Sequence, residues 1–128
     1  MLKQFVLALL TALGWQVGAA QILEVDTAAG SYQGLPSPIA SDVSVFRGLA
    51  FAAPPIGDLR WKPPEPPVTF SGVRLAERSS PACWQARNSD NSVYARGNLD
   101  RSEDCLTLNV FTVAVDDSAG LPVMVWFH

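Results

Sequence analysis

The chain has 128 residues, of which 48% are apolar and 16% charged, and its formal net charge is −3. This composition is typical of a globular protein rather than a disordered one, and the length suits one small domain. The lysines and arginines are scattered singly, so the sequence offers no basic patch of the kind that binds nucleic acid or an anionic membrane.

The first 20 residues are predicted to be a secretory signal peptide. Lys3 is followed by the apolar run FVLALLTALGW, and Gly18 and Ala20 are small residues at positions −3 and −1 of a cleavage site before Gln21. A buried N-terminal helix is the alternative, and the apolar run is too short for a membrane span. We therefore expect a secreted or periplasmic protein with mature chain 21–128 and no membrane span after cleavage.

Two segments in the first half of the mature chain are predicted to be β-strands. Residues 22–35 show β-type alternation and then contain Gly30 and Gly34, a pattern that predicts a short strand and a hairpin turn. Residues 43–52, VSVFRGLAFA, are rich in Val and Phe. Gly48 within this second strand indicates a bulge or a close approach of another backbone segment.

Irregular chain follows these strands. Pairs of prolines between residues 54 and 67 remove hydrogen-bond donors and fix φ, so this segment is predicted to be extended and at the surface. A polyproline II linker between two domains is the alternative, but Ile56, Leu59 and Trp61 favour a segment that packs against the rest of the protein. Residues 71–104 are polar and rich in turn signals.

The chain contains two cysteines, Cys83 and Cys105. In an exported protein such a pair usually forms a disulfide, which would close most of the irregular segment into a loop and stabilise the fold by about 3 kcal/mol. Two free buried thiols are the alternative. A metal site is not expected, because two cysteines and a single histidine do not provide the spacing of four zinc ligands.

The last part of the chain is predicted to contain two strands. Residues 105–115 alternate in polarity and are followed by the turn sequence DDSAG. Residues 123–127, VMVWF, are apolar on both faces, as in a strand inside a covered sheet, and the two strands are compatible with an antiparallel hairpin. The second strand would still need partners, because a central strand with a bare edge and bare faces is unstable. We therefore expect an incomplete part of a larger domain.

Residues that could carry catalysis are sparse. His128 is the sole histidine, and no serine lies in the G-x-S-x-G window that a nucleophile elbow requires. Glu103 and Asp104 are adjacent, so their carboxylates would point to opposite sides of an extended chain and are not expected to act as a facing pair. No Gly-rich phosphate loop is present, and no cofactor is expected. The residues alone predict an exported, β-rich chain with no complete active site.

Three stretches together resemble the type B carboxylesterases. FRGLAFAAPPIGDLRWKPPEP (46–66) resembles the family's F-[RK]-G-[IL]-x-[YF]-A-x-P-P-x-G-x-L-R-[FW]-x-x-P segment. SEDCLTLNVFT (102–112) resembles its S-E-D-C-L-x-L-N-[VI]-[YFW]-[TS] signature, and LPVMVWFH (121–128) resembles the strand that leads into its H-G-G-[GA] loop. Their order and spacing also match, so the resemblance covers about residues 43–128.

This resemblance implies an α/β-hydrolase fold, of which the chain would supply an N-terminal portion made mostly of β-strands and long irregular loops. It implies a disulfide between Cys83 and Cys105 that closes one of these loops. It also implies a structural ion pair between Arg47 and Glu103. His128 would open the oxyanion loop H-G-G-G and would not be the catalytic base.

The family hydrolyses small-molecule carboxylic esters with a Ser–His–Glu/Asp triad. The resemblance therefore implies the N-terminal part of an exported ester hydrolase, itself inactive because the nucleophile, acid, base and oxyanion glycines are not in this sequence. Part of a non-catalytic adhesion or binding protein on the same fold is the alternative, and an independent small secreted module is another. Cholinesterases carry a tryptophan in the disulfide loop where this chain has Tyr94-Ala95-Arg96, which disfavours an acetylcholine-specific enzyme.

Overall fold

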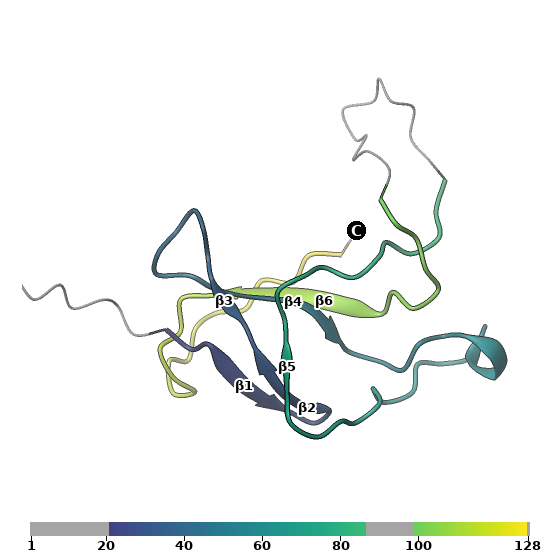
Figure 1. The fold of residues 1–128 in the computed structure, drawn as a ribbon, viewed down its shortest axis with the longest axis horizontal. Coiled ribbons are helices and arrows are strands. Elements are labelled where there is room, and N and C mark those ends of the chain that lie inside the picture. Colours follow the sequence, from purple (N-terminus) through teal and green to yellow (C-terminus); the bar gives the residue numbers. More distant parts are fainter. Residues whose placement is uncertain (1–20, 87–98, 128) are drawn as a thin grey trace, which may run out of the picture.

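The computed structural model describes residues 21–86 and 99–127. These residues form two three-stranded β-sheets, and the helical structure among them is the 3₁₀ turn η1 (Gly57–Leu59). The strand order is β1-β2-β5 in one sheet and β3-β4-β6 in the other (Figure 1). Within this described part, no helix is both long and apolar enough to cross a membrane. The predicted signal peptide, residues 1–20, lies outside the described residues.

The first sheet is built on a hairpin. β1 (Glu24–Thr27) and β2 (Gly30–Gln33) pair antiparallel, and β5 (Val73–Leu75) pairs parallel to β2. At the turn, the Thr27 hydroxyl donates to the Gly30 carbonyl oxygen at 2.8 Å, and Gly30 has a φ of +143°. The strand and hairpin turn predicted for residues 22–35 are therefore confirmed.

The second sheet is antiparallel throughout. β4 (Ser44–Ala50) is its central strand, with β3 (Leu35–Pro36) on one side and β6 (Thr107–Thr112) on the other. Val45 lies opposite Phe111 in the β4–β6 register, and Val45 is buried. The strands predicted in residues 43–52 and 105–115 are both present, and their pairing joins two segments that lie far apart in the sequence.

Gly48 interrupts β4 in both of the ways that the sequence suggested. The register with β6 shifts between Phe46 and Leu49, which is a β-bulge. Gly48 has a φ of +72°, and a Cβ atom there would lie 2.7 Å from the Arg78 carbonyl oxygen. A residue without a side chain is therefore required at this position.

The two sheets share a small apolar core. Tyr32, Phe46 and Ala76 are buried in it, and Phe70 packs against them. The Tyr32 and Phe70 rings meet edge to face with centroids 5.1 Å apart. The guanidinium carbon of Arg74 lies 3.7 Å from the Phe70 ring centroid on the sheet surface. Tyr32 on β2 and Phe46 on β4 belong to different sheets and are buried in the same cluster, so this core joins the two sheets.

The proline-rich segment is extended, as predicted, but it does not pack down as expected. Ile56 is half exposed and Trp61 is 96% exposed, while Leu59 in η1 is partly buried. Trp61 has a φ of +62°, a left-handed conformation that is rare for a bulky residue. Trp61 lies two residues after the end of η1, and no described residue covers its indole.

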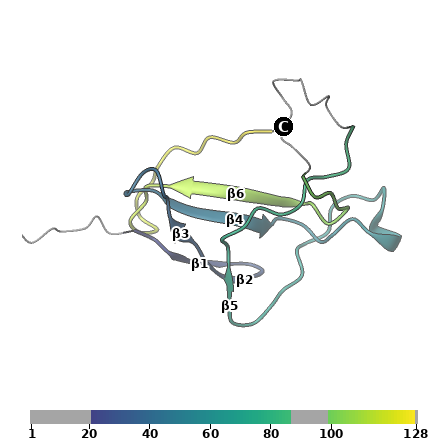
Figure 2. The same ribbon diagram turned by 45° about the horizontal axis from the view of Figure 1, so that its top comes forward.

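The strand predicted for residues 123–127 is not formed. Residues 120–127 run as coil and join no ladder in the described part of the chain, and the side chains of 123–127 are between 65% and 94% exposed. The predicted hairpin is therefore wrong, since β6 takes β4 as its partner and the chain leaves β6 through an open loop (Figure 2). An apolar segment becomes a strand only where a neighbour accepts its hydrogen bonds.

Candidate functional site

The disulfide is the starting point for describing the candidate site, because Cys105 lines one of the cavities of the structure. Cys83 and Cys105 are bonded, with Cα atoms 5.2 Å apart, which confirms the predicted pair. The backbone supports the same closure, because Ala82 and Arg101 form a parallel bridge. The Ala82 amide donates to the Asp100 carbonyl at 2.9 Å, and the Ser102 amide donates to the Ala82 carbonyl at 3.0 Å. The two ends of the loop are thus joined covalently and by hydrogen bonds.

Glu103 forms an ion pair beside the disulfide, but with a different arginine from the one expected. A guanidinium nitrogen of Arg60 lies 2.8 Å from the Glu103 carboxylate, and both side chains are partly exposed. The pair ties the proline-rich segment to the residue two positions before Cys105. The role expected of an Arg47–Glu103 pair is therefore performed by Arg60.

The bulge in β4 explains why Arg47 does not reach Glu103. Because the strand turns at Gly48, the Arg47 backbone amide donates to the Ala76 carbonyl oxygen at 2.7 Å. A guanidinium nitrogen of Arg47 lies 3.5 Å from the Glu77 carbonyl oxygen. Arg47 thus holds the segment that follows β5, and the prediction of its ion pair with Glu103 is wrong.

A shallow cavity of about 510 Å³ opens next to this ion pair. It is lined by Pro55, Arg60, Trp61, Trp84, Ser102, Glu103 and Cys105. The sequence singled out neither Arg60 nor the pairing of two tryptophans. Trp84 is 70% exposed, and Trp61, which was expected to pack against the rest of the protein, is almost fully exposed. The signal lay in the two family-like stretches, because Arg60 and Trp61 lie within residues 46–66 and Glu103 lies within residues 102–112.

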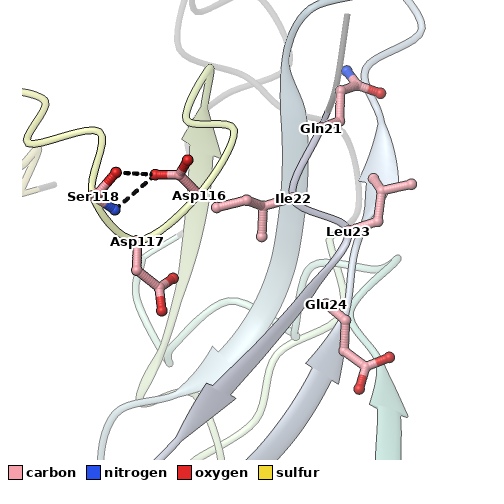
Figure 3. A pocket seen from close by; sticks show the side chains of 7 residues that line it. All are labelled: Gln21, Ile22, Leu23, Glu24, Asp116, Asp117 and Ser118. Atoms are coloured by element: carbon pink, nitrogen blue, oxygen red, sulfur yellow. Dashed lines mark hydrogen bonds between the residues drawn. The ribbon is translucent and has the colours of Figure 1, made fainter.

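A second cavity, of about 530 Å³, lies where the N-terminal segment passes the loop after β6 (Figure 3). It is lined by residues 21–24 and 116–118. The Ser118 hydroxyl and backbone amide both donate to one Asp116 carboxylate oxygen, at 2.5 and 2.8 Å. These two bonds hold the pKa of Asp116 below its ordinary value of 3.8. Within the described residues, no three His, Cys, Asp or Glu side chains gather as a metal would require.

Neither cavity assembles a catalytic constellation among the described residues. His128 lies outside the described residues, as do Tyr94, Ala95 and Arg96. Ser102 lines the cavity beside the Arg60–Glu103 ion pair, and the described residues include no histidine. The lining of this cavity consists of apolar side chains and the paired Arg60 and Glu103, and no nucleophile is paired with a base among the described residues.

Comparison with known protein families gives one match of long extent. The model described as "Carboxylesterase family" matches residues 21–128. Fumonisin B1 esterase of Sphingopyxis macrogoltabida is 40% identical over 102 residues, which cover 80% of this chain and 18% of that protein. Liver carboxylesterase of Sus scrofa is 37% identical over 136 residues, which cover 94% of this chain and 23% of that protein.

Solved structures give the same answer. A PNB esterase superposes with a TM-score of 0.68 at 37% identity, covering 82% of this chain and 21% of that one. The carboxylesterase EST55 of Geobacillus stearothermophilus gives a TM-score of 0.56 at 32% identity, covering 73% of this chain and 17% of that one. The chain spans about a fifth of the length of the relatives it matches.

Proposed function

The chain belongs to the carboxylesterase family and has, over the part described, the α/β-hydrolase fold of that family; from this premise we propose that it is the N-terminal portion of an exported carboxylic ester hydrolase. The observation that carries the proposal is the family match over residues 21–128, the whole of the expected mature chain. It is supported by relatives whose names describe esterases and by a TM-score of 0.68 to a PNB esterase.

In the proposed enzyme, the chain supplies the scaffold that borders the active site. The reaction is acyl transfer to a serine activated by histidine and an acid, followed by hydrolysis, and those three groups come from the rest of the protein. His128 opens the loop whose following glycines donate backbone N–H groups to the oxyanion, and each such donor contributes about 2.7–4 kcal/mol of transition-state stabilisation. Residues 121–127 carry the chain to that loop.

Two described contacts would make this scaffold rigid. The disulfide of Cys83 and Cys105 closes the loop, and the ion pair of Arg60 with Glu103 ties it to the proline-rich segment. A fixed loop exit fixes the start of β6, and β6 is paired to β4 along its length. An oxyanion loop works only when its donors are held in place before the reaction begins.

The 128-residue chain alone is proposed to be inactive, because it contains a single histidine and no G-x-S-x-G sequence. The test compares the purified chain with the protein encoded by the longer reading frame, using p-nitrophenyl acetate and p-nitrophenyl butyrate. We expect hydrolysis only by the longer protein, and its loss when the serine of the elbow is replaced by alanine. The serine-to-alanine variant differs by one oxygen atom, so loss of ester hydrolysis in it would be due to the missing nucleophile and not to a change in the fold.

Two outcomes would contradict the proposal. Hydrolysis by the purified 128-residue chain, above the rate in buffer, would show that its own residues form an active site. A longer protein that folds but carries no serine at the elbow, and hydrolyses neither ester, would favour the adhesion or binding protein on the same fold. Acetylcholine turnover by the longer protein would contradict the substrate expectation drawn from Tyr94-Ala95-Arg96.

A further inference from the structure

Gln21 would become the N-terminal residue of the chain after cleavage of the predicted signal peptide. It follows the small residues Gly18 and Ala20 of the predicted cleavage site, and the family match begins at the same residue. Export by the proposed route therefore leaves Gln21 with a free α-amine. A glutamine in that position carries a nucleophile and an electrophile in one residue.

The fold leaves Gln21 outside its regular structure. Strand pairing begins at Glu24, which lies opposite Gln33, and the Leu23 carbonyl accepts a hydrogen bond from the Gly34 amide. The Gln21 side-chain amide donates one exposed hydrogen bond, 2.7 Å long, to the Ser41 carbonyl oxygen. Breaking an exposed bond costs little, because water replaces the lost partner on both sides.

The neighbouring carboxylates do not hold the amide either. Gln21 lies at the edge of the cavity that residues 116–118 share, and Figure 3 shows its side chain directed away from Asp116 and Ser118. Ile22 is the side chain that points across toward Asp116 in the same view. Among the described residues, the Gln21 side-chain amide is therefore held only by its hydrogen bond to the Ser41 carbonyl oxygen.

We propose that Gln21, once exposed by cleavage, is a modification site that closes to pyroglutamate. The inference rests on the proposed export. The unprotonated α-amine attacks the side-chain Cδ, a bond forms between that nitrogen and Cδ, and the Cδ–Nε2 bond breaks. Ammonia leaves with a proton from the attacking amine, and a five-membered lactam remains. The step needs no oxidant, reductant or cofactor, and it removes the positive charge of the N-terminus.

The experiment measures the intact mass of the exported longer protein, expressed with residues 1–20 in a host that has signal peptidase. After incubation at neutral pH, the mass is expected to be about 17 Da below that of the mature chain starting at Gln21, which is the mass of ammonia. The cyclised protein should also resist aminopeptidase. Gln21→Met is the matched control, because it keeps a side chain of similar length but has no amide that could release ammonia.

The outcomes separate the modification from the export on which it rests. A chain that begins at Gln21 but keeps its full mass and its digestible amine overturns the cyclisation and leaves export intact. A chain that keeps Met1, or begins at another residue, overturns both. A Gln21→Met variant with the same mass loss of about 17 Da would place the loss of ammonia at a different residue and overturn the assignment.

Discussion

The backbone amide of Gly48 donates a 3.0 Å hydrogen bond to the side-chain oxygen of Asn109, across the bulge between β4 and β6. The nitrogen of the same Asn109 amide lies 3.4 Å from the Ser79 hydroxyl, to which it donates. One side chain therefore satisfies the amide that the bulge leaves unpaired and contacts the segment that leads to Cys83. The bulge and the path to the disulfide loop are coupled through Asn109.

Replacement of Gly48 by alanine is expected to destabilise the protein more than the same change at Gly57. Both glycines have positive φ, which costs an alanine about 1–2 kcal/mol. At Gly48 the new Cβ would also lie 2.7 Å from the Arg78 carbonyl, whereas at Gly57 nothing lies within 4 Å. Urea denaturation of the full-length protein measures the difference. An equal decrease in the free energy of unfolding for Gly48→Ala and Gly57→Ala would show that the close contact with the Arg78 carbonyl does not destabilise the protein.

Removal of the disulfide is expected to lower the free energy of unfolding by about 3 kcal/mol, because the loop of Cys83 and Cys105 spans 22 positions. The variant is Cys83→Ser with Cys105→Ser, compared by denaturation with the oxidised full-length protein. Mass spectrometry after alkylation without reductant first checks that the parent has no free thiol. Two alkylated cysteines in the exported parent would contradict both the bond and the closed loop.

The ion pair of Arg60 and Glu103 is expected to contribute at most about 1 kcal/mol, because its side chains are 52% and 39% exposed. A double-mutant cycle with Arg60→Met and Glu103→Gln measures the coupling energy directly. The matched control is the same cycle with Arg47→Met, for which we expect no coupling. A larger coupling for Arg47 than for Arg60 would restore the pair that the family resemblance implied.

Chain 21–128 on its own is expected to aggregate or to remain molten. Val123 to Phe127 expose five apolar side chains without a charge or a proline among them, a composition that favours pairing with other chains. Val125→Lys is expected to increase the soluble fraction measured by light scattering, and the surface variant Thr69→Lys serves as its control. A soluble monomer of 21–128 with a cooperative unfolding transition would contradict this expectation and favour the independent module.

The carboxyl group of Asp116 is expected to titrate below pH 3.8. The Ser118 hydroxyl is the larger cause and the Ser118 backbone amide the smaller, since both donate to the ionised form. The folded-state pKa is depressed, so the contribution to stability is present above pH 3.8 and is lost as pH falls through the lowered value. NMR titration of the side-chain carbon checks this, and Ser118→Ala should raise the pKa. No change in Ser118→Ala would leave the hydroxyl without effect.

The local elements were predictable because their causes are local. Alternation predicted β4 and β6, and Gly30 predicted the hairpin turn, since these signals act within a few residues. The disulfide followed from two cysteines in a chain that was expected to be exported. The Arg47–Glu103 pair failed because one bulge at Gly48 turns the strand, and the position of a bulge does not specify where the side chain beside it is aimed.

The other failures concern partners that are distant in the chain. Val123 to Phe127 have the composition of a buried strand, but composition does not supply a neighbouring ladder. Trp61 was expected to pack because it is aromatic, yet its environment depends on segments that come from elsewhere. The cavity lined by Trp61 and Trp84 was missed for the same reason, since Trp61 lies in the proline-rich segment and Trp84 in the disulfide loop, and the two meet only in three dimensions.

The parallel pairing of β5 with β2 determines the order in which the N-terminal sheet can be completed during synthesis. Ser31 finds its partner in Val73, about forty residues later, whereas the β1–β2 hairpin closes over a two-residue turn. The hairpin is therefore free to form as soon as it leaves the ribosome, but its third strand arrives only after the whole proline-rich segment has been made. Until then, one edge of β2 stays open to any other strand nearby, and the burial of Phe46 against Tyr32 and Ala76 has to wait for that arrival.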